Sequence, residues 1–257
     1  MRNGLLSREG RAFFAAVAFL TRVHVPMLST DESWRDDLKR GLRYFSLVGG
    51  LVGLATGGLF WALCLIFPAP IAALLALAFE ALLTGAFHED ALADFCDAFG
   101  GGVTAEQARA ILKDSRLGSY GALGLILSVS LRAFALMSLA PFFAIFASAA
   151  AGALSRFSAI CAMRLLPPAA DRPSLSKDIG SQPSNASMLF GLAVAAAFLA
   201  RTAMGAPAQT LLGVAASAAI ILLIVSMMKQ KLGGTVGDGL GAIVFISQTL
   251  FLVSLLA

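Results

Sequence analysis

The sequence predicts an all-α, polytopic integral membrane protein, with about seven transmembrane helices in a single domain over residues 1–257. Two observations lead to this prediction. Of the 257 residues, 58% are hydrophobic and 13% are charged, and the mean hydropathy of +0.84 lies outside the range of soluble chains. Apolar stretches of about 20 residues, the length that crosses a bilayer, alternate with short connections that contain Pro, Gly or basic residues.

The first apolar run, residues 12–20, is too short to cross a membrane and is followed by Thr21-Arg22, so we expect an interfacial or re-entrant helix there. The first candidate span contains Gly49, Gly53 and Gly57 at helical spacing, which favours close contact with another helix. The seven candidate spans are residues 44–66, 71–88, 119–140, 141–165, 187–205, 207–228 and 239–257.

Basic residues gather in alternate connections, within residues 1–43, 109–116, 164–177 and 229–231. With seven spans these four regions fall on one side of the membrane, and the positive-inside rule makes that side cytoplasmic. We therefore expect a cytoplasmic N-terminus and an external C-terminus. The net charge of +4 fits this distribution. No basic patch is interleaved with aromatic residues, so nucleic acid is not an expected partner.

Four of the fifteen Asp and Glu residues lie within positions 88–97, directly after the second candidate span. Such a cluster repels itself unless a cation neutralises it. In a helix, Asp90, Asp94 and Asp97 share one face and can present several oxygens to a hard cation such as Mg²⁺. Glu89 can serve a second ion or orient the ligands of the first. The sequence favours a metal site at the membrane interface over a solvated acidic loop.

Glu80 lies inside the second candidate span, where an ionisable side chain costs on the order of 3 kcal/mol and indicates a functional role. Asp94 is fourteen positions further along, so an uninterrupted helix would align the two carboxylates, although Gly85 is a position where that helix can end. The alternative for Glu80 is an ion pair with Arg132 or Arg156. Arg156 itself needs an anionic partner, either Glu80 or a substrate phosphate.

A polar segment after the acidic cluster contains the cations that a phosphate group would need. Lys113 and Arg116 are spaced to bind phosphate oxygens, and Asp114 between them can add a metal ligand or act on a hydroxyl nucleophile. The preceding Gly100–Gly102 allows backbone N–H groups to approach an anion, although a glycine run alone is typical of any loop. The combination of an acidic cluster and a basic segment indicates a metal-bound diphosphate.

Two further residues are candidates with open alternatives. Asp238 lies in the glycine-rich segment 233–241 before the last span, where a plain connecting turn explains the glycines equally well. His88 can be a ligand or a general base, or a hydrogen-bonding residue at a helix end.

Two motifs are specific in combination: Glu80-Ala-Leu-Leu-Thr-Gly-Ala-Phe-His-Glu-Asp-Ala-Leu-Ala-Asp94 and Lys113-Asp-Ser-Arg-Leu-Gly-Ser-Tyr-Gly121. Shorter ones are Phe19–Arg22, Tyr44-Phe45, Leu47–Gly49, Leu154–Arg156, Gly233-Gly234 and Gly237-Asp238. Together, in this order over nearly the whole chain, they resemble the cobalamin synthase (adenosylcobinamide-GDP ribazoletransferase) family. The chain departs from the family pattern at Ala91 and Ala98, where glycine is usual, and at Phe245 and Gln248, where the last span usually carries glutamates.

The resemblance implies that a hydroxyl of α-ribazole, or of its 5′-phosphate, attacks the cobinamide-linked phosphorus of adenosylcobinamide-GDP. GMP leaves, and adenosylcobalamin or its 5′-phosphate forms. It also implies an enzyme of the bacterial cytoplasmic (inner) membrane, in contact with lipid, with cytoplasmic active-site loops and a homo-oligomeric state left open. The implied roles are Mg²⁺ binding by Glu89, Asp90, Asp94 and Asp97, substrate binding by Lys113, Ser115, Arg116 and Arg156, and catalysis by Glu80, His88, Asp114 and Asp238.

Two other functions fit part of the pattern. A phospho-alcohol transferase of the CDP-alcohol phosphatidyltransferase type also uses an Asp-rich membrane helix and Mg²⁺, but the Ala-Arg element usual in that class is missing after Asp94. A polytopic transporter could use Glu80 and Arg156 as a coupling pair. Most of the acidic residues lie in the connections rather than at mid-membrane, where a transport site is expected.

Overall fold

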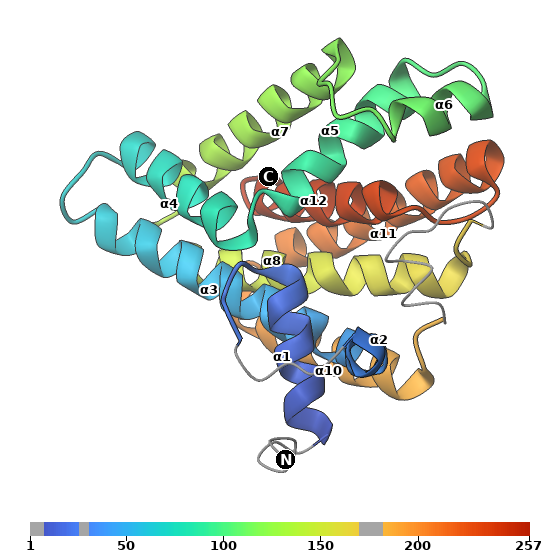
Figure 1. The fold of residues 1–257 in the computed structure, drawn as a ribbon. Helices are drawn as coiled ribbons and strands as arrows, with labels where there is room; N and C mark the ends of the chain where they lie inside the picture. The colour runs from blue at the N-terminus through green and yellow to red at the C-terminus, as the bar shows by residue number, and fades with distance from the viewer. Residues whose placement is uncertain (1–7, 26–30, 170–181) are drawn as a thin grey trace.

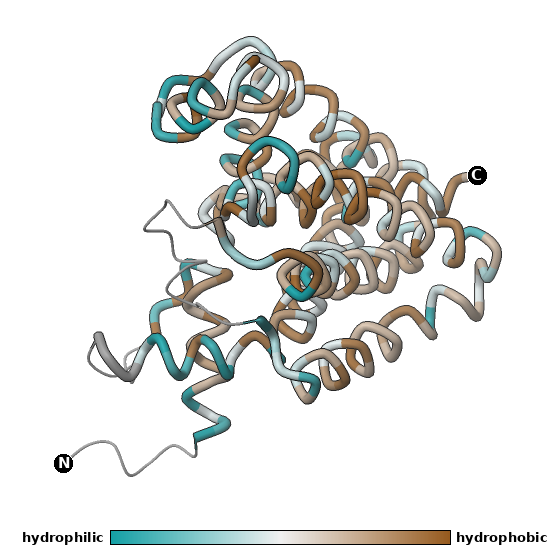
Figure 2. Tube along the Cα trace, turned by 90° about the vertical axis from the view of Figure 1, so that its right-hand side faces the viewer, coloured by the Kyte–Doolittle hydropathy of each residue, from teal (hydrophilic) through white to brown (hydrophobic). Residues whose placement is uncertain are grey.

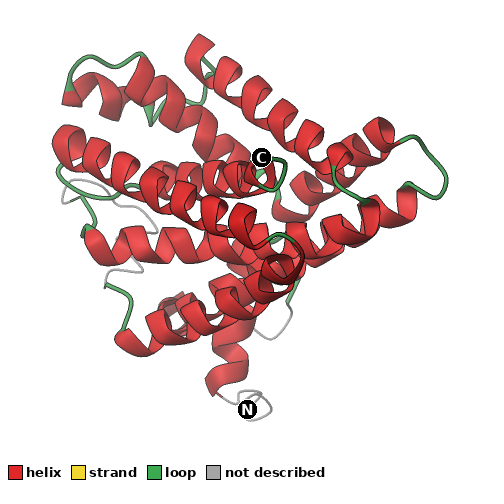
Figure 3. Ribbon diagram, turned by 180° about the vertical axis from the view of Figure 1, so that it is seen from behind, coloured by secondary structure: helices red, strands yellow, loops and turns green. Residues whose placement is uncertain are grey.

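The structure is a computed structural model that describes residues 8–25, 31–169 and 182–257. In this part of the chain the regular elements are helices, with one isolated bridge between Pro168 and Thr235 (Figures 1 and 3). The all-α prediction is confirmed. The elements are α1 (Arg8–Leu20), α2 (Asp31–Gly41), the 3-10 turn η1 (Leu42–Tyr44), α3 (Phe45–Leu63), α4 (Ala69–Thr84), α5 (Phe87–Gly100), α6 (Ala105–Ile111), α7 (Ser119–Ser138), α8 (Pro141–Leu165), α10 (Asn185–Gly205), α11 (Pro207–Leu232) and α12 (Gly237–Ser254).

Within the described residues, six helical segments are long and apolar enough to cross a membrane, and a seventh results if the bent pair α4 and α5 counts as one span. The six are the segment Trp34–Leu63, which ends in α3, and the helices α7, α8, α10, α11 and α12. This agrees with the predicted number of spans. Helix α1, with 13 residues, is too short to cross and packs against α2 and α3 through buried Ala12, Ala15 and Ala16.

The second predicted span is broken rather than straight. Helix α4 ends at Thr84, and Gly85 (φ 73°) and Ala86 (φ 55°) both adopt the left-handed conformation. Glycine reaches this region at no steric cost, so the chain turns here and α5 leaves at 90° to α4. In Figure 1, α4 begins at the end of the bundle where α3 ends, and α5 finishes at the opposite end beside α6. The acidic cluster therefore lies on a helix of its own.

The centre of the bundle is the close packing of α3 against α8. A Cβ atom at Gly49 would lie 2.3 Å from the carbonyl oxygen of Gly152, one at Gly53 would lie 2.1 Å from that of Ser148, and one at Gly57 would lie 2.7 Å from that of Ala144. Small residues four apart on both helices allow the backbones to touch. The close contact predicted for the first span is confirmed.

The polar connections gather at one end of the bundle. Figure 1 shows that α6, the end of α8, the start of α10 and the α11–α12 connection lie at this end, while the α3–α4, α7–α8 and α10–α11 hairpins lie at the other. Figure 2 looks onto the polar end and shows the hydrophilic stretches there. The described parts of the basic connections thus lie at one end of the bundle, as the sequence predicts, whereas Arg2, Arg172 and Lys177 lie outside the described residues.

Candidate active site

The acidic residues of α5 differ in burial because the helix is covered on one side by α7 and α12. Asp90 is exposed, Glu89 and Asp94 are half-buried, and Asp97 is buried with 8% of its surface exposed. The Oε2 atom of Glu89 is buried and has no hydrogen-bond partner among the described residues. The predicted helical face exists, but its members meet different surroundings.

Asp97 caps the start of α7. Its Oδ2 atom accepts a hydrogen bond from the backbone N–H of Gly118, and its Oδ1 atom accepts one from that of Gly121, both at 2.8 Å. These donors belong to the first turn of α7, where backbone N–H groups lack helical partners and a negative charge is favoured. A Cβ atom at Gly118 or Gly121 would lie 2.4 or 2.3 Å from a carboxylate oxygen of Asp97, so glycine is required at both positions.

This cap ties the predicted phosphate-binding segment to the acidic helix. Lys113, Ser115 and Arg116 are exposed just before α7, and Gly118, which Asp97 holds, follows two residues after Arg116. Asp114 pairs with Arg116 at 2.6 Å, and the hydrogen bond from Arg116 lowers the pKa of the Asp114 carboxyl below its ordinary value. Asp114 therefore orients Arg116 and is ionised at neutral pH.

Glu80 belongs to a buried network that connects four helices. Its two oxygens lie 2.9 Å from Nη2 of Arg132 on α7. The side-chain amide of Gln248 on α12 donates to Glu80 at 3.0 Å and accepts from Nη1 of Arg156 on α8 at 2.7 Å. The ion pair expected as the alternative to a site role for Glu80 is thus present with Arg132, and Arg156 reaches Glu80 through Gln248. The guanidinium of Arg132 also lies 4.9 Å from the ring centre of Phe245.

His88 and Glu89 lie beside this network at the start of α5. His88 is buried, and the charges of Arg132 and Arg156 act on both side chains. The Nε atoms of both arginines are buried without a hydrogen-bond partner among the described residues. Glu80 forms the ion pair of this network, with Arg132 at 2.9 Å. Sequence reasoning singled out Gln248 as a departure from a family pattern but did not identify it as the bridge between Glu80 and Arg156.

Asp238 is half-buried in the first turn of α12, at the polar end of the bundle. The start of α12 packs against the start of α5, and a Cβ atom at Gly241 would lie 2.3 Å from Cβ of Ala91. The start of α12, which contains Asp238, thus lies beside the acidic helix.

Packing explains the glycine run after α5. A Cβ atom at Gly100 would lie 2.7 Å from the ring of Tyr120, and one at Gly102 would lie 2.9 Å from the backbone nitrogen of Ala108. The predicted anion-binding role of this run is not needed to account for it.

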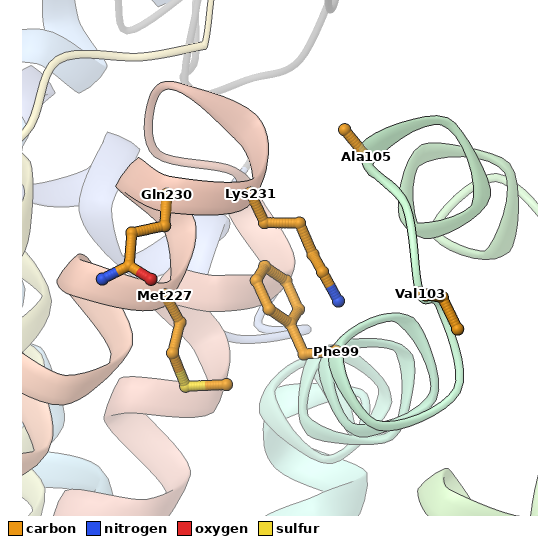
Figure 4. A pocket seen from close by; sticks show the side chains of 6 residues that line it. All are labelled: Phe99, Val103, Ala105, Met227, Gln230 and Lys231. Carbon is orange, nitrogen blue, oxygen red and sulfur yellow. The ribbon is translucent and has the colours of Figure 1, made fainter.

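A cavity of about 350 Å³ lies next to this run, between the end of α5 and the last turns of α11 (Figure 4). The amine of Lys231 lies 5.2 Å from the ring centre of Phe99 and donates a hydrogen bond to the carbonyl of Gly102. The remaining lining residues are Val103, Ala105, Met227 and Gln230. Because the lining has no carboxylate, the cavity is no candidate for a metal site.

The acidic residues fit a magnesium ion only if substrate completes its coordination. Among the described residues, no group of three or more His, Cys, Asp or Glu side chains is placed to hold a metal ion. Asp97 already accepts two backbone hydrogen bonds. Magnesium is usually held by one or two carboxylates together with water and substrate phosphates. Asp90 and Asp94, one turn apart, meet this requirement, and the buried free oxygen of Glu89 is a further donor beside them.

The fold and the site define a polytopic α-helical membrane protein in which an acidic helix and a basic segment meet at one end of the bundle, the arrangement expected of an enzyme that acts on phosphate groups. Comparison with known proteins identifies the family. The cobalamin-5-phosphate synthase family matches residues 12–256, and the chain belongs to that family.

Curated relatives carry the name adenosylcobinamide-GDP ribazoletransferase. One from Leptothrix cholodnii is 42% identical over 92% of this chain and 91% of its own length. Another from Shewanella frigidimarina is 40% identical over 97% of this chain and 95% of its own length. No solved structure matches the chain. The family favours the transferase over the phosphatidyltransferase and transporter alternatives.

Proposed function

We propose that this protein is an adenosylcobinamide-GDP ribazoletransferase of cobalamin biosynthesis, with α-ribazole or its 5′-phosphate as the acceptor. The observation that carries the proposal is the Asp97 cap, which fixes the basic segment 113–118 beside the acidic helix α5. Cations for a diphosphate and carboxylates for a metal ion thereby share one end of the bundle. A transfer between phosphate groups requires both.

The reaction forms a bond from an acceptor hydroxyl oxygen to the cobinamide-linked phosphorus and breaks the bond from that phosphorus to GMP. Lys113 and Arg116, both exposed, bind the phosphate oxygens of the diphosphate. Asp114 orients Arg116. Asp90 and Asp94, with Glu89 beside them, would hold Mg²⁺, which when bound neutralises charge on the phosphates and on the leaving GMP.

The hydroxyl proton needs an acceptor. Asp114 is a weak base because the hydrogen bond from Arg116 lowers the pKa of its carboxyl. Glu80 is held by Arg132 and Gln248 within the bundle, and His88 is enclosed at the start of α5. We propose that Asp238, in the first turn of α12 beside α5, accepts the proton. Glu80 and Arg156 act as positioning residues for the α4–α5 break.

The distribution of basic connections supports a cytoplasmic location for this end of the bundle by the positive-inside rule. We propose that the protein lies in the inner membrane of a bacterium with the site facing the cytoplasm, where nucleotide substrates are available.

The test is GMP release by the purified protein in lipid, supplied with adenosylcobinamide-GDP, Mg²⁺ and either α-ribazole or its 5′-phosphate. If no GMP is released with α-ribazole and none with its 5′-phosphate, the proposed function is refuted. Asp90→Asn should lower turnover at least 100-fold while the variant elutes as a folded protein. Glu106→Gln, which also removes an exposed acid at this end, is the matched control and should keep wild-type turnover. Near-normal turnover of Asp90→Asn would refute the metal assignment and leave the reaction intact.

A further inference from the structure

A second cavity of about 350 Å³ lies away from the candidate active site, where α2 and η1 meet the start of α10. Four of its eight polar lining residues are basic, and one is acidic. The basic residues are Arg8, Lys39, Arg40 and Arg43, the acidic residue is Asp36, and Ser184 and Ser187 come from the first turn of α10.

The charges around this cavity are not balanced within the described part of the chain. Glu9 accepts hydrogen bonds from Arg40 and Arg43, and Asp36 supplies one more negative charge. Arg8 and Lys39 have no ion-pair partner among the described residues. Four cations thus face two carboxylates, and the Nε atom of Arg43 is buried with no hydrogen-bond partner among those residues. Clustered cations of this kind are stabilised by a bound anion.

The cavity lies at the level where two membrane spans begin. Apolar α3 starts at Phe45, directly after Arg43 and Tyr44, and α10 starts at Asn185. The ring of Tyr44 packs against Phe13 and Phe190, with centroids 5.7 and 5.3 Å apart. Aromatic residues at span ends are typical of the headgroup region of a bilayer. The anion that reaches this cavity most readily is therefore part of a lipid.

The basic cavity and the acidic helix α5 lie too far apart to bind the same phosphate group. Helix α1 separates the two places: Arg8 at its start lines the cavity, while beyond its end the backbone N–H of Arg22 donates to Leu83, next to the α4–α5 break. Thirteen helical residues span about 20 Å. A diphosphate bound at α5 cannot reach the basic cavity.

We propose that this cavity binds the phosphate of an anionic phospholipid headgroup. The unbalanced cations recognise the charge, and the surrounding aromatic side chains accept the upper part of the acyl chains. The bound lipid would also hold α1, and through Arg22 it would support the turn between α4 and α5.

The test measures phosphatidylglycerol bound to the protein by native mass spectrometry from a neutral detergent, with phosphatidylcholine as the uncharged lipid. One Lys or Arg near an anionic headgroup contributes about 1 kcal/mol, so Lys39→Gln should weaken phosphatidylglycerol binding about fivefold and leave phosphatidylcholine binding unchanged. Lys229→Gln is the matched control because Lys229 is also exposed in the last turn of a helix at this end. It should bind as the wild type does.

Three outcomes would overturn the proposal. Equal weakening in Lys39→Gln and Lys229→Gln would show general surface attraction, and no weakening in Lys39→Gln would show that the cavity holds no lipid phosphate. In a second arm, inorganic pyrophosphate is added in excess. Displacement of the Lys39-dependent phosphatidylglycerol by low-millimolar pyrophosphate would identify a site for soluble phosphates instead. Persistence of the lipid under these conditions supports the proposal.

Discussion

Replacing Asp97 should release the basic segment from the acidic helix. The carboxylate accepts two backbone hydrogen bonds at 2.8 Å from the first turn of α7. A net hydrogen bond to a charged group contributes about 1.5–3 kcal/mol, and losing an N-terminal cap costs about 0.5–2 kcal/mol. Because water can reach part of this turn, we expect Asp97→Ala to cost about 2–4 kcal/mol. At the lower value the open population of the segment rises about 30-fold.

Limited trypsin digestion measures this opening directly, since Lys113 and Arg116 are exposed cleavage sites in the segment. When opening is fast compared with cleavage, the cleavage rate follows the open population. Asp97→Ala should therefore be cut after these residues at least 30 times faster than the wild type. Asp97→Asn, which keeps one acceptor oxygen and loses the charge, should lie between the two.

Two further variants make the test specific. Gly121→Ala should reproduce the faster cleavage, because its methyl group would lie 2.3 Å from the Asp97 carboxylate. Asp90→Ala is the control, since Asp90 is an exposed acid on the same helix and should be cut at the wild-type rate. Wild-type cleavage of Asp97→Ala would refute the cap, and equal acceleration by Asp90→Ala would show that the charge of α5 matters rather than the hydrogen bonds.

Three other perturbations test the framework around the site. Glu80→Gln leaves two buried guanidinium groups with little compensating charge and should lower the free energy of unfolding by about 3–5 kcal/mol, which is measured as a lower melting temperature in detergent. The additional change Arg132→Met should recover part of this stability. A normal melting temperature for Glu80→Gln alone would contradict the network. Gly53→Ala would place a methyl group 2.1 Å from the carbonyl of Ser148, so it should separate α3 from α8 and lower the yield of folded protein. Gly58→Ala is the control and should fold normally, because its new methyl group meets no neighbouring atom within 4 Å. The hydrogen bond from Arg40 lowers the pKa of Glu9 below 4.5, so the pair stabilises the fold above pH 4.5, and this stabilisation is lost as the pH falls through the lowered pKa. The difference in melting temperature between wild type and Glu9→Gln should therefore be constant from pH 7 to pH 5 and vanish only below the lowered pKa. A difference that disappears near neutral pH would contradict this cause.

Local patterns in the sequence predict the spans and their packing face well. Length and hydropathy identify the membrane helices, because each span must satisfy its own backbone hydrogen bonds. The spacing of Gly49, Gly53 and Gly57 predicts a close helix contact, although it does not name α8 as the partner. The acidic residues of α5 form a helix as their spacing indicates.

Long-range partners could not be predicted in the same way. The spacing of Asp97 from Asp94 predicts a metal ligand. In the structure its carboxylate instead accepts hydrogen bonds from the start of α7, which lies more than twenty residues further along the chain. Gly118 and Gly121 carry the signal for this contact, since two glycines in the first turn of a helix leave room for a foreign side chain. Without the packing of α5 on α7, these glycines are indistinguishable from loop residues.

The α4–α5 break connects these findings. If α4 continued through Gly85, Glu80 and Asp94 would lie on one face of one helix and compete for the same cations. The left-handed turn instead leaves Glu80 in the bundle, paired with Arg132, and turns the acidic residues of α5 towards the polar end. Gln248 contributes to this separation, because its neutral amide bridges Glu80 and Arg156 without adding a negative charge to the network. The ion pair of Glu80 with Arg132 thus stays within the bundle, and Asp90 lies exposed on α5, outside this network.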